Sequence, residues 1–239
     1  VSDELDREPA DAFGGPDRAH DSFTDTQKAI SYSMTSFFTT GGIRGGKKKL
    51  DKFYPRSFNM GIRRDVYMEL GGFSKMLFGE DIDFSIRIFK AGKRCRLFPE
   101  AWVWHKRRTD FRKFWRQVYN SGIARVNLYK KYPESLKLVH LLPMVFTLGV
   151  ALLLVISLVG LVLANWWLAA TPLLLLFAYY YLNVCYSWYY FHNFKANILS
   201  GIAAYVQLTG YGCGFIEAWW KRCVRKQDEF TAYEKNFYK

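Results

Sequence analysis

A stretch of 57 residues without a charged side chain places the strongest constraint on how this 239-residue chain folds. No Asp, Glu, Lys or Arg occurs from Leu138 to Phe194. The stretch contains two apolar runs, Leu141–Ala164 and Leu168–Tyr190. Each run exceeds the roughly 20 residues that an α-helix needs to cross the core of a bilayer. The sequence therefore predicts a helical membrane hairpin that turns at Asn165–Trp167, where tryptophans would lie at the interface.

The segments outside this hairpin are less clear. Val1–Ala10 is acidic and lacks the apolar core of a signal peptide, so we expect the anchor to lie on the C-terminal side. Ile198–Trp220 is interrupted by polar residues, and the sequence leaves open whether it crosses the bilayer. Its glycines would allow close helix packing; they are Gly201, Gly210, Gly212 and Gly214.

The net charge of +13 is unevenly distributed along the chain. Residues 43–131 hold 23 basic and eight acidic side chains, whereas residues 1–42 hold three basic and eight acidic ones. Three ordinary causes of such an excess are anionic lipid at the cytoplasmic face, a polyphosphate ligand and nucleic acid. The bias predicts that the basic region faces the cytoplasm. The basic start of the tail, "KRCVRK", favours the same side, whereas three full spans would place it outside.

Apolar periodicity and breaker residues predict the remaining elements. We expect helices over Thr26–Thr40, Asp81–Ala91 and Thr109–Tyr132, and strands over Phe58–Ile62, Arg94–Phe98 and Ala101–His105. Within the acidic start of the chain, Phe13–Phe23 ("FGGPDRAHDSF") is predicted to be an irregular loop. Gly41–Lys49 is predicted to be either a surface loop or a loop that closes over a phosphorylated substrate. Aromatic and cationic residues alternate along Thr109–Tyr132, which favours a helix in the lipid interface over one that binds single-stranded nucleic acid. The four cysteines form no zinc-binding pattern and are expected to be reduced.

Glu80, Asp81 and Asp83 stand together at the predicted start of a helix. Carboxylates in the first turn are favoured by the helix dipole, so a purely structural role is possible for all three. Asp83 is four residues before Arg87, a spacing that allows an ion pair on one helix face.

Three segments in this order and spacing carry a family resemblance: "NMGIRRDVYMELGGF", "GEDIDFSIRIFKAGK" and "RLFPEAWVWH". The region from about Phe13 to Arg125 resembles the second half of the catalytic domain of family 2 glycosyltransferases, which are inverting enzymes of the GT-A fold, many with C-terminal membrane helices. The implied fold class is α/β, a partial GT-A nucleotide-diphospho-sugar transferase domain, plus an α-helical membrane region. The implied segments are the C-terminal half of the GT-A domain (1–108), an amphipathic interfacial helix (109–137), a membrane region with two to three helices (138–220) and a polar tail (221–239).

The resemblance also implies roles for single residues. Asp81 would be the general base that takes the proton from the acceptor hydroxyl, and Glu80 would cap the helix or orient the acceptor. His105 would bind a divalent cation (Mg²⁺ or Mn²⁺) or contact the diphosphate, and Arg107 and Arg108 would brace that diphosphate. From the residues alone, a histidine such as His105 is more often structural, and the two arginines are equally well explained as juxtamembrane cations.

Two departures from the family refine these expectations. The motif Q-x-x-R-W of processive polysaccharide synthases is absent at Gln117, which favours transfer of a single sugar. The family's metal-binding D-x-D belongs after an early strand, so we do not assign Asp81-Ile82-Asp83 to it. The donor-binding half is not recognisable, and we expect a C-terminal part of a larger enzyme that is inactive in isolation.

The expected protein is a multi-pass membrane hexosyltransferase whose catalytic part faces the cytoplasm. Its expected partners are a nucleotide-diphospho-sugar donor, a lipid-linked or glycan acceptor and membrane lipid, but no nucleic acid. The alternatives are a membrane-anchored basic module that binds anionic lipid or nucleic acid, and a structural membrane subunit.

Overall fold

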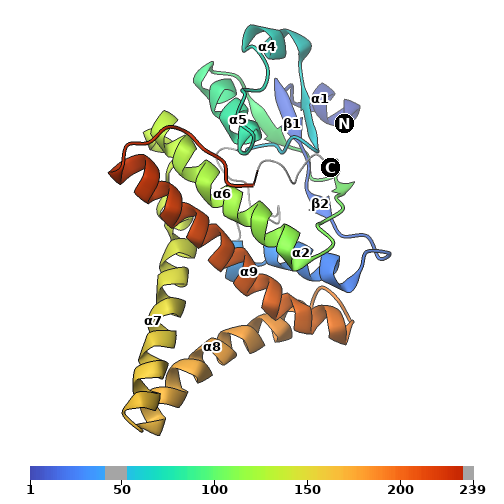
Figure 1. The fold of residues 1–239 in the computed structure, drawn as a ribbon. Coiled ribbons are helices and arrows are strands. Elements are labelled where there is room, and N and C mark those ends of the chain that lie inside the picture. The colour runs from blue at the N-terminus through green and yellow to red at the C-terminus, as the bar shows by residue number, and fades with distance from the viewer. Residues whose placement is uncertain (41–52, 234–239) are drawn as a thin grey trace. The chain divides into compact units, whose positions relative to one another are not determined.

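The computed structural model describes residues 1–40 and 53–233, and these form two compact units (Figure 1). The described part of the first unit consists of residues 1–22 and 53–106, and that of the second of residues 23–40 and 107–233. The chain is mostly helical with a small sheet, which is compatible with a partial α/β domain followed by a helical region. The predicted loop Gly41–Lys49 lies outside the described residues.

The first unit is built around short strands. β3 (Met60–Ile62), β1 (Ala12–Gly14) and β4 (Cys95–Leu97) form a sheet in that order, with β1 antiparallel to β3 and parallel to β4. β2 (Asp17–Arg18) pairs in parallel with β5 (Val103–Trp104). The helices of this unit are α1 (Ser2–Arg7), α4 (Arg64–Glu69) and α5 (Glu80–Lys90).

The prediction that Phe13–Phe23 is an irregular loop is wrong, because this segment includes most of β1 and all of β2. β1 lies between β3 and β4, and its Ala12 is fully buried. A three-residue strand is too short to show an alternating pattern, and its position is set by backbone pairing with partners far along the chain. Nothing local in the sequence therefore marks it.

Helix α5 packs on this sheet through Phe84 and Ile88, which form a core cluster with Ala12. The two side chains lie on one face of the helix because they are four residues apart. Glycines end the helices of this unit as the sequence predicts. Gly71 and Gly72 after α4 and Gly92 after α5 have φ angles between 67° and 72°, in the left-handed region that favours glycine.

The second unit is helical. Its elements are α2 (Asp25–Thr35), α3 (Phe37–Thr40), α6 (Phe111–Lys131), η1 (Pro133–Ser135), η2 (Leu138–Leu141), α7 (Leu142–Val162), α8 (Trp166–Ser187), α9 (Phe194–Trp219) and the π-helical turn η3 (Trp220–Val224). The helix predicted over Thr26–Thr40 is interrupted at Ser36, whose ψ of 142° is extended. α2 packs in this second unit, whereas residues 1–108 were predicted to form one domain. The assignment of a function to each of the four predicted segments stays a prediction.

Helices α7 and α8 carry the apolar runs. Within the described residues, Leu138–Val162 and Trp166–Ser187 are long and apolar enough to cross a membrane, and α9 does not meet that criterion. The two helices splay apart from a shared turn (Figure 1), where the Ser157 hydroxyl donates to the Ala169 carbonyl over 2.7 Å. Most of their large apolar side chains are exposed. Exposure of this kind is not found in the core helix of a soluble domain.

Helix α9 packs against α2, α6, α7 and α8, and its glycines make this possible. α6 and α9 lie side by side (Figure 1), and a Cβ atom on Gly214 would overlap the backbone carbonyl of Tyr119. In return, a Cβ atom on Gly122 of α6 would overlap the carbonyl of Tyr211. The predicted close packing at the glycines is confirmed.

The apolar face of α6 is buried against protein. Phe114 and Val118 pack with Ile30 of α2, and Ile123 packs with Phe215 of α9. If α6 contacts lipid, the contact must therefore be made by residues outside this apolar face. All four cysteines lie among the described residues and are free thiols, and burial raises the pKa of Cys95 to about 12.

Candidate active site

The first turn of α5 presents the carboxylates. Gly79 precedes the helix with a φ of 82°, and Glu80 and Asp81 follow it directly. Asp81 is only 9% exposed. Its Oδ1 accepts a hydrogen bond from the backbone N–H of Ile82 over 2.8 Å, and its Oδ2 lies 3.4 Å from Nη1 of Arg56. The contact with Arg56 is at the long limit for a hydrogen bond.

Glu80 has a different environment from its neighbour. Its Oε1 lies 3.3 Å from the hydroxyl of Ser57, which donates to it. Burial raises the pKa of Glu80 above its usual value, and the charge of Asp81 raises it further. Two adjacent carboxyl groups thus differ in their hydrogen-bond partners: Asp81 contacts the Arg56 guanidinium, and Glu80 accepts from the Ser57 hydroxyl, although the charge of Arg56 also acts on Glu80. Different environments of this kind permit different protonation roles.

Asp83 serves the architecture of the unit. It is fully buried, and its Oδ2 lies 3.1 Å from Nε of Arg87. The same guanidinium donates to the carbonyls of Leu70 and Gly72, over 2.6 Å each. The predicted ion pair four residues along the helix is confirmed, and it fixes the turn after α4 to α5. Asp83 is therefore accounted for by a structural contact.

Three consecutive residues join the predicted site residues. Arg56 contacts Asp81, Ser57 contacts Glu80, and the ring of Phe58 stacks on His105 with 3.9 Å between centroids and 22° between planes. The segment forms a turn, because the N–H of Asn59 donates to the carbonyl of Arg56 over 2.8 Å. The Asn59 side chain also donates to the carbonyl of Ala101 over 2.8 Å. Glu80, Asp81 and His105 are thus each in contact with a residue of this turn, Arg56–Asn59.

Sequence reasoning missed Arg56 and Ser57 and placed Phe58 only in a strand. The available signal was a cation and a hydroxyl directly before the "FNMGIRR" run. Their partners lie more than 20 positions further along the chain, so no local periodicity marks them.

His105 follows β5, and its backbone N–H donates to the carbonyl of Arg18 over 3.2 Å. The His105 ring is half-buried. Within residues 1–40 and 53–233, no group of three or more His, Cys, Asp or Glu side chains is arranged to hold a metal ion. The described residues by themselves therefore do not fit a complete divalent-cation site. His105 would be one ligand among others.

Arg107 and Arg108 belong to the second unit. The Arg107 carbonyl accepts a hydrogen bond from Nε2 of Gln27 over 2.9 Å, and Arg108 donates from Nε to Oε1 of Gln117 over 3.1 Å. Burial lowers the pKa of Arg107 to about 10, and it also lowers that of Arg108, yet Arg107 stays charged at neutral pH. Their predicted contact with a diphosphate stays a prediction.

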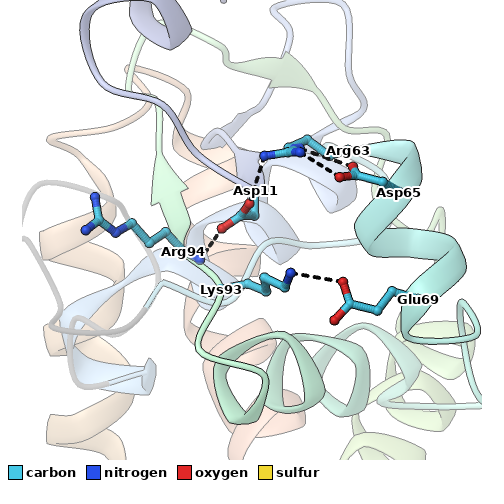
Figure 2. A network of polar contacts seen from close by, with 6 residues as sticks. All are labelled: Asp11, Arg63, Asp65, Glu69, Lys93 and Arg94. Carbon is cyan, nitrogen blue, oxygen red and sulfur yellow. Dashed lines mark hydrogen bonds and ion pairs between the residues drawn. The ribbon is translucent and has the colours of Figure 1, made fainter.

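A second polar region of the first unit holds the sheet together. Figure 2 shows Asp11 between Arg63 and Arg94: Asp11 lies 3.4 Å from the Arg63 guanidinium and accepts from the Arg94 backbone over 2.8 Å. Lys93 pairs with Glu69 over 2.9 Å. A nearby depression of about 630 Å³ is lined by residues 7–9, 89 and 92–96 and contains none of the predicted site residues. These contacts join the ends of β1, β3 and β4, and they account for Asp11 and Arg63 without a ligand.

Comparison with known proteins identifies the family to which the chain belongs. The family model described as "Glycosyl transferase family group 2" matches residues 57–189, which is more than half of the chain. The match includes most of the turn Arg56–Asn59, all of α5 and His105. The chain belongs to the family 2 glycosyltransferases, and the resemblance seen in the three sequence segments is confirmed.

A curated relative supports the same family. The probable glycosyltransferase YdaM of Bacillus subtilis (strain 168) is 34% identical over 71 residues, which are 30% of this chain and 16% of that protein. The chain thus spans about a sixth of the length of the relative it matches. No solved structure matches the chain significantly.

Proposed function

We propose that this chain is part of a membrane-anchored, inverting glycosyltransferase that moves a hexose from a nucleotide-diphospho-sugar to a hydroxyl of a lipid-linked or glycan acceptor. The observation that supports the proposal is the turn Arg56–Asn59 of a family 2 chain, whose consecutive residues contact Asp81, Glu80 and His105. Asp83 is fully buried and closely paired with Arg87, whereas Asp81 has only a long contact with Arg56, so Asp81 is the carboxylate to which we assign the chemistry.

Asp81 is assigned as the general base. The acceptor hydroxyl donates to Oδ2 in place of Arg56, and its oxygen attacks the anomeric carbon of the donor. As the new C–O bond forms, the bond from that carbon to the diphosphate breaks, and the nucleoside diphosphate leaves with the electron pair. The proton of the hydroxyl passes to Asp81, so one displacement inverts the anomeric configuration. Glu80 orients the acceptor from the neighbouring position.

The small sheet and α4–α5 correspond, in this proposal, to the acceptor-side half of a GT-A domain. The nucleotide is assigned to residues outside the described first unit. A Mg²⁺ or Mn²⁺ ion would neutralise the charge of the leaving diphosphate, with His105 as one ligand. Arg107 and Arg108 are proposed to add cationic support on the diphosphate.

Helices α7 and α8 are proposed to span the membrane as a hairpin. Their exposed leucine and valine side chains would face lipid acyl chains, and the Asn165–Trp167 turn would lie on the side opposite the basic region. The catalytic unit would then face the cytoplasm. Helix α9, held by α2, α6, α7 and α8, would pack beside the hairpin without crossing the bilayer as a third lipid-exposed span.

The alternative, a basic module that binds anionic lipid or nucleic acid, has less support. It requires cations that act together on a surface. Several cations of the first unit instead form ion pairs with carboxylates; they are Arg56, Arg63, Arg87, Lys93 and Arg96.

The proposal is tested by incubating the natural protein, extracted in detergent from its membranes, with a panel of nucleotide-diphospho-hexoses and candidate acceptors. We expect release of nucleoside diphosphate together with a glycoside of inverted anomeric configuration, assigned by proton NMR. A product that retains the configuration of the donor would exclude the single displacement with Asp81 as base. Absence of transfer with every donor would exclude the function.

A further inference from the structure

Phe58 has an unusual position for a large apolar side chain. One face of its ring lies against His105, yet 41% of the residue remains exposed. It occupies the third position of the turn Arg56–Asn59, whose first two side chains contact Asp81 and Glu80. A partly exposed aromatic residue therefore directly follows, in the same turn, the two residues that contact the carboxylates.

The turn is anchored on both sides, so the ring has a defined place. The Asn59 side chain binds the carbonyl of Ala101, and the backbone of Arg56 and Asn59 forms an isolated antiparallel bridge. The ring of His105 supports Phe58 from one side. The exposed part of Phe58 is thus supported by its contact with His105, and a ligand would meet it without a large ordering cost.

The chemistry of this arrangement favours a sugar hydroxyl over a lipid phosphate as the acceptor group. The face of an aromatic ring is electronegative, and it attracts the polarised C–H groups on one face of a pyranose ring. Carboxylates beside it accept hydrogen bonds from sugar hydroxyls. An acceptor whose nucleophile is an anionic lipid phosphate would instead meet the like charges of Asp81 and Glu80, which repel it.

We propose that Phe58 is an acceptor-binding residue and that the accepting hydroxyl belongs to a sugar, whose ring stacks on the open face of Phe58. This inference rests on the proposed function and narrows its acceptor from "lipid-linked or glycan" to a compound that presents a pyranose. A lipid-linked acceptor fits only if its lipid carries a sugar.

The test uses the natural full chain in detergent with the variants Phe58→Leu and Phe58→Tyr. The matched control is Phe73→Leu, because Phe73 is 40% exposed in the same unit and packs on Tyr67 and Phe84. The probes are the methyl glycosides of glucose, galactose, mannose and N-acetylglucosamine, with undecaprenyl phosphate as the anionic-lipid acceptor. Acceptor and donor KM are measured by transfer, and sugar binding without donor is measured by saturation-transfer NMR.

We expect Phe58→Leu to raise the KM of the preferred glycoside by about 3- to 10-fold, the scale of one aromatic contact, with the donor KM unchanged. Phe58→Tyr and Phe73→Leu should stay near wild type. An unchanged acceptor KM in Phe58→Leu, an equal effect of Phe73→Leu, or a preference for undecaprenyl phosphate would overturn the inference. If sugar binding depends on Phe58 but no donor is consumed, the sugar site stands and the proposed function fails.

Discussion

Replacing Arg87 by alanine tests whether the buried carboxylate of α5 is structural. In the first unit, Arg87 pairs with the fully buried Asp83 and donates to the carbonyls of Leu70 and Gly72. The variant Arg87→Ala removes all three contacts and leaves the charge of Asp83 without this cation. Because these contacts tie α5 to the turn after α4, we expect both segments to loosen together.

The size of the effect follows from burial. Removing one partner of a buried ion pair typically costs about 3–5 kcal/mol. The Arg87 side chain is 23% exposed, so solvent screens part of the interaction, and we expect about 3 kcal/mol. An exposed charge at a helix terminus would be worth only about 0.3–1 kcal/mol. The two interpretations of Asp83 therefore differ by a measurable amount.

Hydrogen–deuterium exchange of the α5 amides in the detergent-solubilised chain measures the difference. A cost of about 3 kcal/mol corresponds to exchange that is faster by about 100-fold where opening limits it. The control is Arg63→Ala, which breaks an exposed pair with Asp65 (59% and 62% exposed) and a longer contact with Asp11. Because neither contact involves α5, this variant should change exchange of the α5 amides far less. If Arg87→Ala accelerates exchange no more than Arg63→Ala, the structural assignment of Asp83 is wrong.

Three further predictions concern the helix crossing, the pH dependence and the membrane topology. Gly214→Ala places a methyl group on the Tyr119 carbonyl and should destabilise the second unit by about 1–3 kcal/mol in detergent unfolding, whereas Gly149→Ala, with open space around it, should be neutral or stabilising. Because the pKa of Glu80 is raised, its ionised form disfavours the fold, so wild-type stability should fall as the pH rises from below the usual glutamate range through the raised value. Glu80→Gln should therefore be more stable than wild type at neutral pH in thermal unfolding but not at acidic pH; an equal gain at both would refute this cause. With the other three cysteines changed to serine, Cys223 in sealed vesicles should react only from the cytoplasmic side, and external labelling would indicate three spans instead.

Much of the fold could be predicted from local patterns. The predicted helix Asp81–Ala91 corresponds to α5 at Glu80–Lys90, and the predicted strands near residues 95 and 103 exist in shorter form. The apolar runs became α7 and α8 because an uncharged stretch of this length has few other structures. The glycines of α9 predicted its close packing because a residue without Cβ at helical spacing permits close helix approach.

The rest depended on contacts between distant parts of the chain. β1 is defined by pairing with residues about 50 and 80 positions later, and α2 packs with helices that begin beyond residue 110. The candidate site shows the same limit. Asp81 and Glu80 were found because three carboxylates at a helix start are conspicuous, but the turn that joins them to His105 carries no pattern of its own.

The most direct test of the account is the transfer rate of Asp81→Asn in the natural full chain, with nucleotide-sugar affinity measured in parallel. The substitution keeps the size of the side chain and removes its capacity to take a proton. We predict that turnover falls by about 10²- to 10⁴-fold, the usual cost of losing a positioned general base, while donor affinity changes little. Asp83→Asn, compared at a temperature where it is folded, should retain most of the turnover. Near-full turnover of Asp81→Asn, with loss of activity in Asp83→Asn, would contradict the assignment of Asp81 as the base.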